Sequence, residues 1–333
     1  MDTMQEMQEW VESLERRART RLGNGRVADY IPALAQRRAD QFGIALCTNN
    51  GDVYCAGEAQ ESFSIQSIAK ALLLTLALRV HGDTLWTRVG RNPSGMPFNS
   101  LTQLEVEGGK PRNPFINAGA IAVTDRLVSA FATPSKHLRD VARRLSANPT
   151  IHIDERVQAS EWRHRDRNAA MAYLMKAFGH LDNDVDAVLQ AYFSCCALSM
   201  SCVDLARAFN FLAAGGYARP LGEQFIAPDL SRRINSLLFT CGMYDAAGDF
   251  AYRAGLPAKS GVGGGIIAIV PGCFSVCAWS PALDECGNSV AAQYVLELLA
   301  DDMGHGAGAL LTTAPASGVA PWWPRPPSSR ASR

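Results

Sequence analysis

The segment from Ile65 to Val80 constrains the fold more than any other part of the sequence. Between Glu61 and Arg79 it carries a single charged residue, Lys70. A helix on the surface of a globular protein needs one polar face, and this segment has none. We therefore expect a helix over residues 65–80 that is buried on all sides, which requires further layers of structure around it.

Strand patterns occur towards both ends of the chain. Phe42–Thr48 and Val53–Ala56 are short apolar runs, and the residues between them, 49–52, read Asn-Asn-Gly-Asp, a typical hairpin turn. Three later runs are rich in aromatic and aliphatic residues, as strands are: Phe250–Ala254, Ile266–Val270 and Phe274–Trp279. Pro271-Gly272 predicts a turn between the last two runs.

Helical patterns occupy most of the remaining chain. Residues 3–22 have one apolar face, and a short helix is expected to begin near Tyr30 or Pro32. Further helical patterns span residues 124–145, 166–178, 184–193, 202–214 and 289–302.

This order of elements favours a mixed α/β protein of the α+β type. A doubly wound parallel sheet would need regular βαβ alternation, which the sequence lacks. We predict a single domain over residues 1–304. A mostly antiparallel sheet flanked by helices would come from about 1–83 and 245–304, and a helical subdomain from about 84–244. Residues 305–333, rich in Pro, Ala and Ser, are predicted to form a disordered tail.

Composition excludes several classes of protein. The 333 residues are 47% hydrophobic, so the bulk of the chain is not disordered. Lys+Arg and Asp+Glu are 32 each, and no basic stripe predicts a nucleic-acid partner. Residues 260–283 carry no charge, but glycines and Pro271-Gly272 interrupt them, so no membrane span is expected.

Cysteine and histidine spacing argues against a disulfide framework and against a metal site. The nine cysteines are odd in number and form no C-x-x-C pair, and the six histidines are scattered. We expect reduced thiols in a cytoplasmic protein, because the first ten residues also lack the pattern of an export signal.

Ser67-Ile68-Ala69-Lys70 is an S-x-x-K motif. A spacing of three places both side chains on one helical face, where an amine is positioned to activate the serine hydroxyl. Ser67 would lie in the first helical turn, whose free N–H groups favour a developing oxyanion.

The sequence uses lysine sparingly, with 27 Arg and only 5 Lys. Lys70 and Lys259 are two of the five, and arginine would be unable to release a proton at either position. Burial in an apolar helix shifts a lysine towards its neutral, basic form. We infer that both residues serve proton chemistry or supply a compact charge, the alternative being a lysine that is salt-bridged or reaches the surface.

Lys259-Ser260-Gly261 is the second element of a known pair. An S-x-x-K motif together with K-[ST]-G is the signature of serine β-lactamases and penicillin-binding proteins. Residues 262–265, Val-Gly-Gly-Gly, lead into a predicted strand. The glycines let the backbone approach a substrate, and the Val262 N–H is a candidate oxyanion donor.

From about Gly25 to Leu299 the sequence resembles the serine-dependent glutaminases, which share the β-lactamase-like fold. Eight blocks in the expected order carry the resemblance: Val27–Pro32, Ile65–Lys70, Asn113–Ile121, Ser160-Glu161, Arg167-Asn168, Tyr192, Cys241–Asp245 and Lys259–Gly265.

The resemblance implies hydrolysis of L-glutamine to L-glutamate and ammonia through a serine ester, without a cofactor or metal. It implies that Ser67 is the nucleophile and Lys70 its proton partner, with Tyr30 and Tyr244 as hydroxyl donors or proton relays. The residues implied to contact substrate are Ser67, Asn117, Glu161, Asn168, Tyr192, Tyr244 and Val262. Lys259, Ser260 and Gly261 would support them. Family members are commonly homo-oligomers, often tetramers.

The implied residue types suit a zwitterionic amino acid. The ammonium of glutamine needs an acceptor, which Glu161 supplies. Its carboxylate needs donors, which Asn117, Asn168 and Tyr192 offer. A nearby lysine cation favours a phenolate, so Lys70 and a tyrosine form a coupled pair whose proton the sequence does not assign.

Two other readings of the same motifs remain at this point. One is a β-lactamase or D-Ala-D-Ala peptidase, although such proteins work outside the cytoplasm. The other is a non-catalytic module that senses an amino acid, although such a module would tolerate the loss of Ser67 or Lys70.

Overall fold

The computed structural model describes residues 3–29, 31–94 and 100–304. Tyr30 and the predicted tail 305–333 lie outside the described residues. The centre is a five-stranded sheet in the order β3-β2-β11-β10-β9, and every neighbouring pair in it is antiparallel. Its strands are β2 (Gly43–Thr48), β3 (Val53–Gly57), β9 (Ala258–Ser260), β10 (Gly265–Val270) and β11 (Phe274–Trp279).

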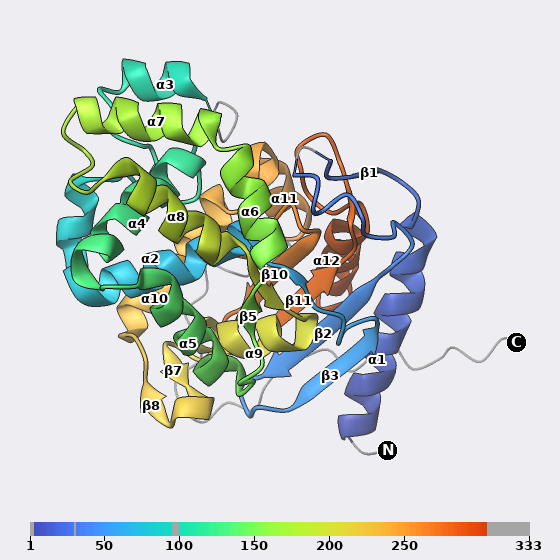
Figure 1. Ribbon diagram of the computed structural model, residues 1–333. Coiled ribbons are helices and arrows are strands. Elements are labelled where there is room, and N and C mark those ends of the chain that lie inside the picture. The colour runs from blue at the N-terminus through green and yellow to red at the C-terminus, as the bar shows by residue number, and fades with distance from the viewer. Residues whose placement is uncertain (1–2, 30, 95–99, 305–333) are drawn as a thin grey trace, which may run out of the picture.

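Helices cover both faces of this sheet, because its strands are buried on both sides. On one face, alternate residues such as Ile44, Ile266 and Val276 pack with α1 (Thr3–Ala18), α11 (Ala247–Arg253) and α12 (Val290–Asp302). On the other face Ala45, Ile267 and Cys277 belong to a larger core that includes α9 (Cys202–Ala213). Figure 1 shows α1 lying along one side of the sheet, with α9 on the opposite side.

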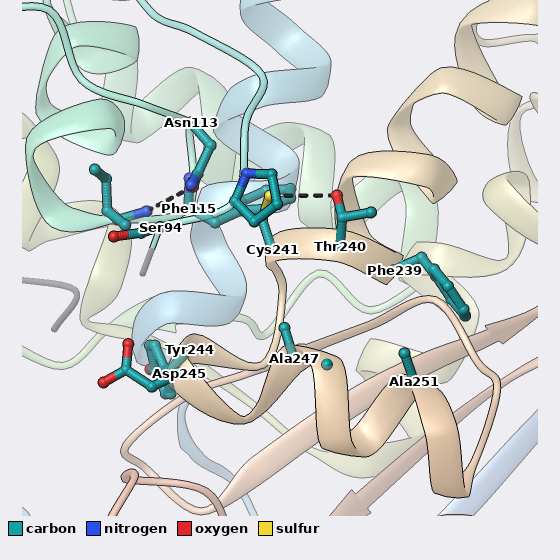
Figure 2. A pocket seen from close by; sticks show the side chains of 13 residues that line it. Ser94, Asn113, Phe115, Phe239, Thr240, Cys241, Tyr244, Asp245, Ala247 and Ala251 are labelled. Atoms are coloured by element: carbon teal, nitrogen blue, oxygen red, sulfur yellow. Dashed lines mark hydrogen bonds between the residues drawn. The ribbon is translucent and has the colours of Figure 1, made fainter. Parts of the chain in front are cut away.

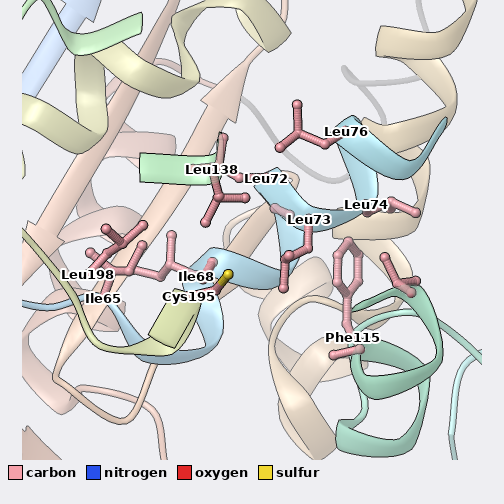
Figure 3. Close-up of a cluster of buried hydrophobic side chains, with 14 of the residues drawn as sticks. Ile65, Ile68, Leu72, Leu73, Leu74, Leu76, Phe115, Leu138, Cys195 and Leu198 are labelled. Carbon is pink, nitrogen blue, oxygen red and sulfur yellow. The ribbon is translucent and has the colours of Figure 1, made fainter. Parts of the chain in front are cut away.

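The larger core surrounds α2 (Ala69–His81). Every residue of α2 from Ala69 to Leu78 is buried. The helix packs against α4 (Asn117–Ala130), α5 (Pro134–Ser146), α8 (Val185–Cys196) and α10 (Pro228–Cys241). Figure 3 shows leucines leaving α2 towards Phe115, Leu138 and Cys195. The prediction of a helix buried on all sides is confirmed.

The remaining elements are short. Three more helices complete the helical region: α3 (Leu101–Val106), α6 (Glu155–Arg163) and α7 (Asp166–Ala177). Two small antiparallel sheets join segments that are distant in sequence: one pairs β1 (Arg26–Val27) with β12 (Ala282–Leu283), and the other has the order β4 (Phe63–Ser64), β6 (Leu198–Met200), β5 (His152–Ile153). A third pair, β7 (Tyr217–Ala218) and β8 (Glu223–Gln224), is local.

Three predicted elements differ from the structure. Residues 250–254 are helical, at the end of α11, because the buried positions Ala247, Phe250 and Ala254 recur with a helical period. The helix predicted over 124–145 is two helices, and Pro134 begins the second. No helix begins near Pro32, since residues 31–37 form turns.

The mixed α/β class with antiparallel sheets and many helices is confirmed. The nine cysteines are unpaired. In the described part of the chain, no helix has both the length and the apolar character needed to cross a lipid bilayer.

Truncation of a side chain in the middle of α2 should test how completely the helix is enclosed. Leu73 is fully buried, whereas Val80 at the end of the same helix is 46% exposed. We expect Leu73→Ala to lower the free energy of unfolding by about 2–5 kcal/mol, because it leaves a cavity. Val80→Ala is the control and should cost less than about 1 kcal/mol in urea denaturation. Equal losses would contradict the burial of α2.

Candidate active site

A cavity of about 270 Å³ brings together residues from seven separate segments of the chain. Its lining consists of Ile31, Gln66, Ser67, Asn117, Glu161, His164, Arg167, Asn168, Tyr192, Cys196, Tyr244 and Val262. All seven residues expected to contact substrate are among them. Of the two other residues with an expected catalytic role, Lys70 is not among the lining residues and Tyr30 lies outside the described residues.

Ser67 lies in a short 3₁₀ turn, Gln66–Ile68, that leads directly into α2. It is half-buried and hydrogen-bonds to Tyr244. The segment after β9 approaches this turn closely, since a Cβ on Gly261 would lie 3.3 Å from the Ser67 nitrogen. Among the described residues, neither the Ser67 N–H nor the Val262 N–H donates to a backbone carbonyl. Both residues line the cavity, so their N–H groups are the candidate oxyanion donors.

Backbone strain is concentrated beside Ser67. Gln66 has a φ of 50° and Tyr244 a φ of 52°, the left-handed region that side chains disfavour. In the described chain only Ala147, which ends α5, shares this feature among residues other than glycine. Each such residue costs about 1–2 kcal/mol. The strain lies in the residue that precedes the serine and in the residue that hydrogen-bonds to it, a distribution typical of functional sites.

The amine of Lys70 is enclosed by protein, with 1% of the residue exposed. Its Nζ donates to the Phe115 carbonyl at 3.0 Å and to Asn117 Oδ1 at 2.7 Å. Burial lowers the pKa of Lys70 to about 8, although the Glu161 carboxylate acts in the opposite direction. A neutral amine has two hydrogens, and these two acceptors use both. The nitrogen lone pair is then free to accept a proton.

The orientation of two asparagine amides follows from Lys70. The ammonium form of Lys70 only donates, so Asn117 must turn its oxygen towards Nζ and its nitrogen away. That nitrogen donates to Asn168 Oδ1 at 3.1 Å. The Asn168 nitrogen is thereby left as a donor at the cavity wall. This arrangement offers N–H groups to an anion, such as the carboxylate of an amino acid.

Glu161, on α6, supplies the carboxylate of the cavity. Burial raises its pKa to about 7, and a hydrogen bond from the Gln66 side chain acts against this rise, as does the charge of Lys70. The group is therefore close to its midpoint at neutral pH. An ammonium that enters the cavity would favour the ionised form.

Two buried groups of α8 complete the wall. Burial raises the pKa of Tyr192 well above its usual 10, and its side chain hydrogen-bonds to Cys196. Burial also raises the pKa of the Cys196 thiol, to about 12. Both groups remain protonated at neutral pH, so Tyr192 offers a hydroxyl hydrogen and no charge.

Lys259 lies behind Tyr244 and does not line the cavity. Its Nζ donates to the carbonyls of Gly242 at 2.8 Å and Ser260 at 2.7 Å, and it lies 4.3 Å from the centre of the Tyr244 ring. The Tyr244 hydroxyl donates to the Ser260 carbonyl at 3.4 Å. Burial raises the pKa of Tyr244 to about 12 and lowers that of Lys259 well below its usual value. Lys259 thus holds the backbone of Gly242 and Ser260, and Ser260 in turn accepts the hydrogen bond of Tyr244.

Five lining residues received no role in the sequence analysis: Ile31, Gln66, His164, Arg167 and Cys196. Gln66 and Arg167 belong to matched blocks, and His164 lies one helical turn after Glu161, but neither signal indicates contact with a cavity. Within the described residues, no group of three or more Asp, Glu, His or Cys side chains is arranged to hold a metal ion.

A second cavity, of about 330 Å³, shares Tyr244 with the first. Figure 2 shows Thr240 and Cys241 at the end of α10, above Ala247 and Ala251 of α11. Some polar groups here already have partners, since Thr240 bonds to Cys241 and the Asn113 oxygen accepts from Phe115 N–H. Apart from Tyr244, this cavity contains none of the expected site residues.

Comparison with known proteins identifies the family. The profile described as Glutaminase matches residues 25–307. A glutaminase of Marinomonas sp. (strain MWYL1) is 55% identical over 298 residues, which cover 90% of this chain and 98% of the relative. A glutaminase of Pseudomonas entomophila (strain L48) is 57% identical over 282 residues, covering 85% and 92%.

Solved structures agree with the sequence comparison. A probable glutaminase, ybaS, superposes with a TM-score of 0.87 at 34% identity, covering 93% of this chain and 100% of that one. A probable glutaminase from Bacillus subtilis, solved in complex with 6-diazo-5-oxo-L-norleucine, has a TM-score of 0.79 at 32% identity, covering 89% and 95%. The chain belongs to the glutaminase family of amidohydrolases.

Proposed function

We propose that the protein hydrolyses the side-chain amide of L-glutamine to L-glutamate and ammonia through an ester on Ser67. The observation that carries this proposal is a serine that hydrogen-bonds to Tyr244 at the start of a helix, one turn before a buried lysine of lowered pKa. Glutaminases more than half identical to this chain support the choice of substrate.

In the first half of the reaction, Ser67 Oγ attacks the amide carbon and a C–O bond forms. The serine proton passes to the lone pair of Lys70, directly or through the Tyr244 hydroxyl. The N–H groups of Ser67 and Val262 stabilise the oxyanion. When the C–N bond breaks, the proton is returned to the nitrogen and ammonia leaves.

In the second half, water attacks the ester carbon. The same amine accepts a proton from the water, the C–O bond to Ser67 breaks, and the serine oxygen recovers its hydrogen. Glutamate is then released. Water is the only reactant besides glutamine in these steps, and they use no cofactor.

The cavity's polar groups match the two charges of the substrate. Glu161 accepts from the ammonium, and the amide nitrogen of Asn168 and the hydroxyl of Tyr192 donate to the carboxylate. A substrate that lacks either group leaves a buried partner unsatisfied, which is the source of selectivity. We further propose a homo-oligomer, with a tetramer expected from the family resemblance and testable by sedimentation.

The nucleophile is tested by Ser67→Ala with glutamine, asparagine and a penicillin as substrates. We expect ammonia only from glutamine, and a loss of about three or more decades in rate for the variant. 6-Diazo-5-oxo-L-norleucine should label the wild-type peptide that contains Ser67. Ammonia release that survives in Ser67→Ala, or a label on another peptide, would overturn the assignment.

Lys70→Arg separates charge from proton transfer. Arginine keeps the positive charge, but its guanidinium does not release a proton near neutral pH. We therefore expect Lys70→Arg to be nearly as inactive as Lys70→Ala when kcat is compared. Near-normal turnover in the arginine variant would mean that Lys70 acts only through its charge.

The pH dependence of kcat/KM follows from Lys70 and Glu161. Lys70 must be neutral and Glu161 ionised, and both forms become more populated as the pH rises through about 8 and about 7. We expect kcat/KM to rise at least about tenfold between pH 6 and pH 8. A flat profile over this interval would contradict both assignments.

A further inference from the structure

We propose that the second cavity is the passage through which ammonia leaves the active site and water reaches the Ser67 ester. Its ligands would be water, ammonia and other small uncharged amines. This inference rests on the proposed function, because it assigns a path to the two small molecules that the reaction exchanges. Neither the family resemblance nor the comparisons assign a role to this cavity.

The ester stage of the proposed reaction requires an exchange of small molecules beside a bound group. The glutamyl group stays in the first cavity, attached to Ser67, while ammonia departs and water takes its place at the ester carbon. Glu161 and Asn168, which line that cavity, hold the charged end of the group in the proposed complex. Exchange is therefore most direct from the other side of the catalytic groups.

The two cavities meet at Tyr244, which lines both of them. The segment before α4 forms a second common boundary. Asn113, Phe115 and Ile116 line the second cavity, whereas Asn117, the next residue, lines the first. Figure 2 shows Phe115 and Tyr244 among the side chains that surround the second cavity. These two segments thus form a partition between the two cavities.

The amine of Lys70 lies at this partition. Its Nζ donates to the Phe115 carbonyl at 3.0 Å and to Asn117 Oδ1 at 2.7 Å, so each cavity wall contributes one acceptor. Tyr244, the other proton-transfer residue of the proposed reaction, faces both cavities. Water that arrives through the second cavity therefore meets the groups that take its proton, and ammonia departs from the groups that protonated it.

The burial of its lining residues indicates that the second cavity extends from the surface to the partition. Asn113, Phe115 and Tyr244 are buried, whereas Thr240 and Asp245 are exposed. Most of the other lining residues are apolar. An apolar passage favours an uncharged molecule over an ion, so ammonia would leave in its neutral form.

Amines that replace water at the ester provide a test of this passage. The amine nitrogen attacks the ester carbon, a C–N bond forms, the C–O bond to Ser67 breaks, and the proton released by the nitrogen returns to the serine oxygen. Hydroxylamine, methoxyamine and benzyloxyamine are uncharged near neutral pH and differ mainly in size. Mass spectrometry then gives the ratio of γ-glutamyl product to glutamate. This ratio describes the fate of one ester, so it does not depend on the amount of active enzyme.

Two substitutions change the width of the second cavity in opposite directions. Ala251→Phe on α11 narrows the cavity, whereas Phe239→Ala on α10 widens it. Because each amine is larger than water, we expect Ala251→Phe to lower the ratio at least about fivefold with hydroxylamine, and further with methoxyamine. Phe239→Ala should raise the ratio at least about fivefold with benzyloxyamine.

His164→Phe and Ala187→Phe are the controls. His164 lines the first cavity and not the second, so a larger ring there narrows only the substrate side. Ala187 is exposed on α8 and lines neither of these cavities. Both variants should keep the ratio of the parent protein with every amine.

Equal ratios in the parent protein, Ala251→Phe and Phe239→Ala would overturn the proposal. A ratio that is lowered by His164→Phe instead would overturn it as well, because the amines would then enter through the first cavity. Ala251→Leu is a smaller obstruction that keeps the inference testable should Ala251→Phe fail to fold. Failure of the proposed function has a different signature, since the parent protein itself would then form no γ-glutamyl product from any amine.

Discussion

The buried amine of Lys70 is the constraint on which the rest of the site depends. An ammonium or amine enclosed by protein is tolerated only when its hydrogens have acceptors. Those acceptors, the Phe115 carbonyl and the Asn117 amide, belong to the approach and first turn of α4. The cavity can exist only when α4 is packed against α2, so the apolar core around α2 and the chemistry at its first turn are one structural requirement.

Two short chains of hydrogen bonds carry that requirement into the cavity, and each has a fixed direction. One runs from Lys70 through Asn117 to Asn168 and ends in a free donor. The other runs from Gln66 through Ser64 to the carbonyl of Cys196, and it turns the amide nitrogen of Gln66 towards Ser64. The lining of the cavity thus includes an N–H donor, the Asn168 amide, and a carboxylate, that of Glu161. Gln66 and Tyr244 adopt left-handed backbone conformations in this arrangement. At these two residues the site is formed against the local conformational preference of the backbone.

Much of this arrangement could be predicted from the sequence, and the reasons are specific. Lys70 is the single charged residue in an apolar segment, so its burial could be predicted. The Asn-Gly turn between two short apolar runs predicts the hairpin that β2 and β3 form. The strand predicted at 250–254 was wrong because alternation over five residues does not distinguish a strand from a helix whose far face is exposed, as Tyr252 is at 81%. Gln66 had no sequence signal of function, because its φ and its partners Ser64 and Glu161 appear only when distant segments meet.

Cys196 gives the cavity a property of its own. It places a sulfur atom on the wall of the cavity in which we propose that substrate binds, and sulfur is intrinsically a better nucleophile than a hydroxyl. Burial keeps this thiol protonated, with a pKa of about 12, and only the thiolate reacts readily with an acyl group. Burial therefore has two effects here: it favours the neutral amine of Lys70, and it keeps the Cys196 thiol in its unreactive protonated form. In the proposed reaction, burial thus disfavours the sulfur of Cys196 as a competitor of the Ser67 hydroxyl.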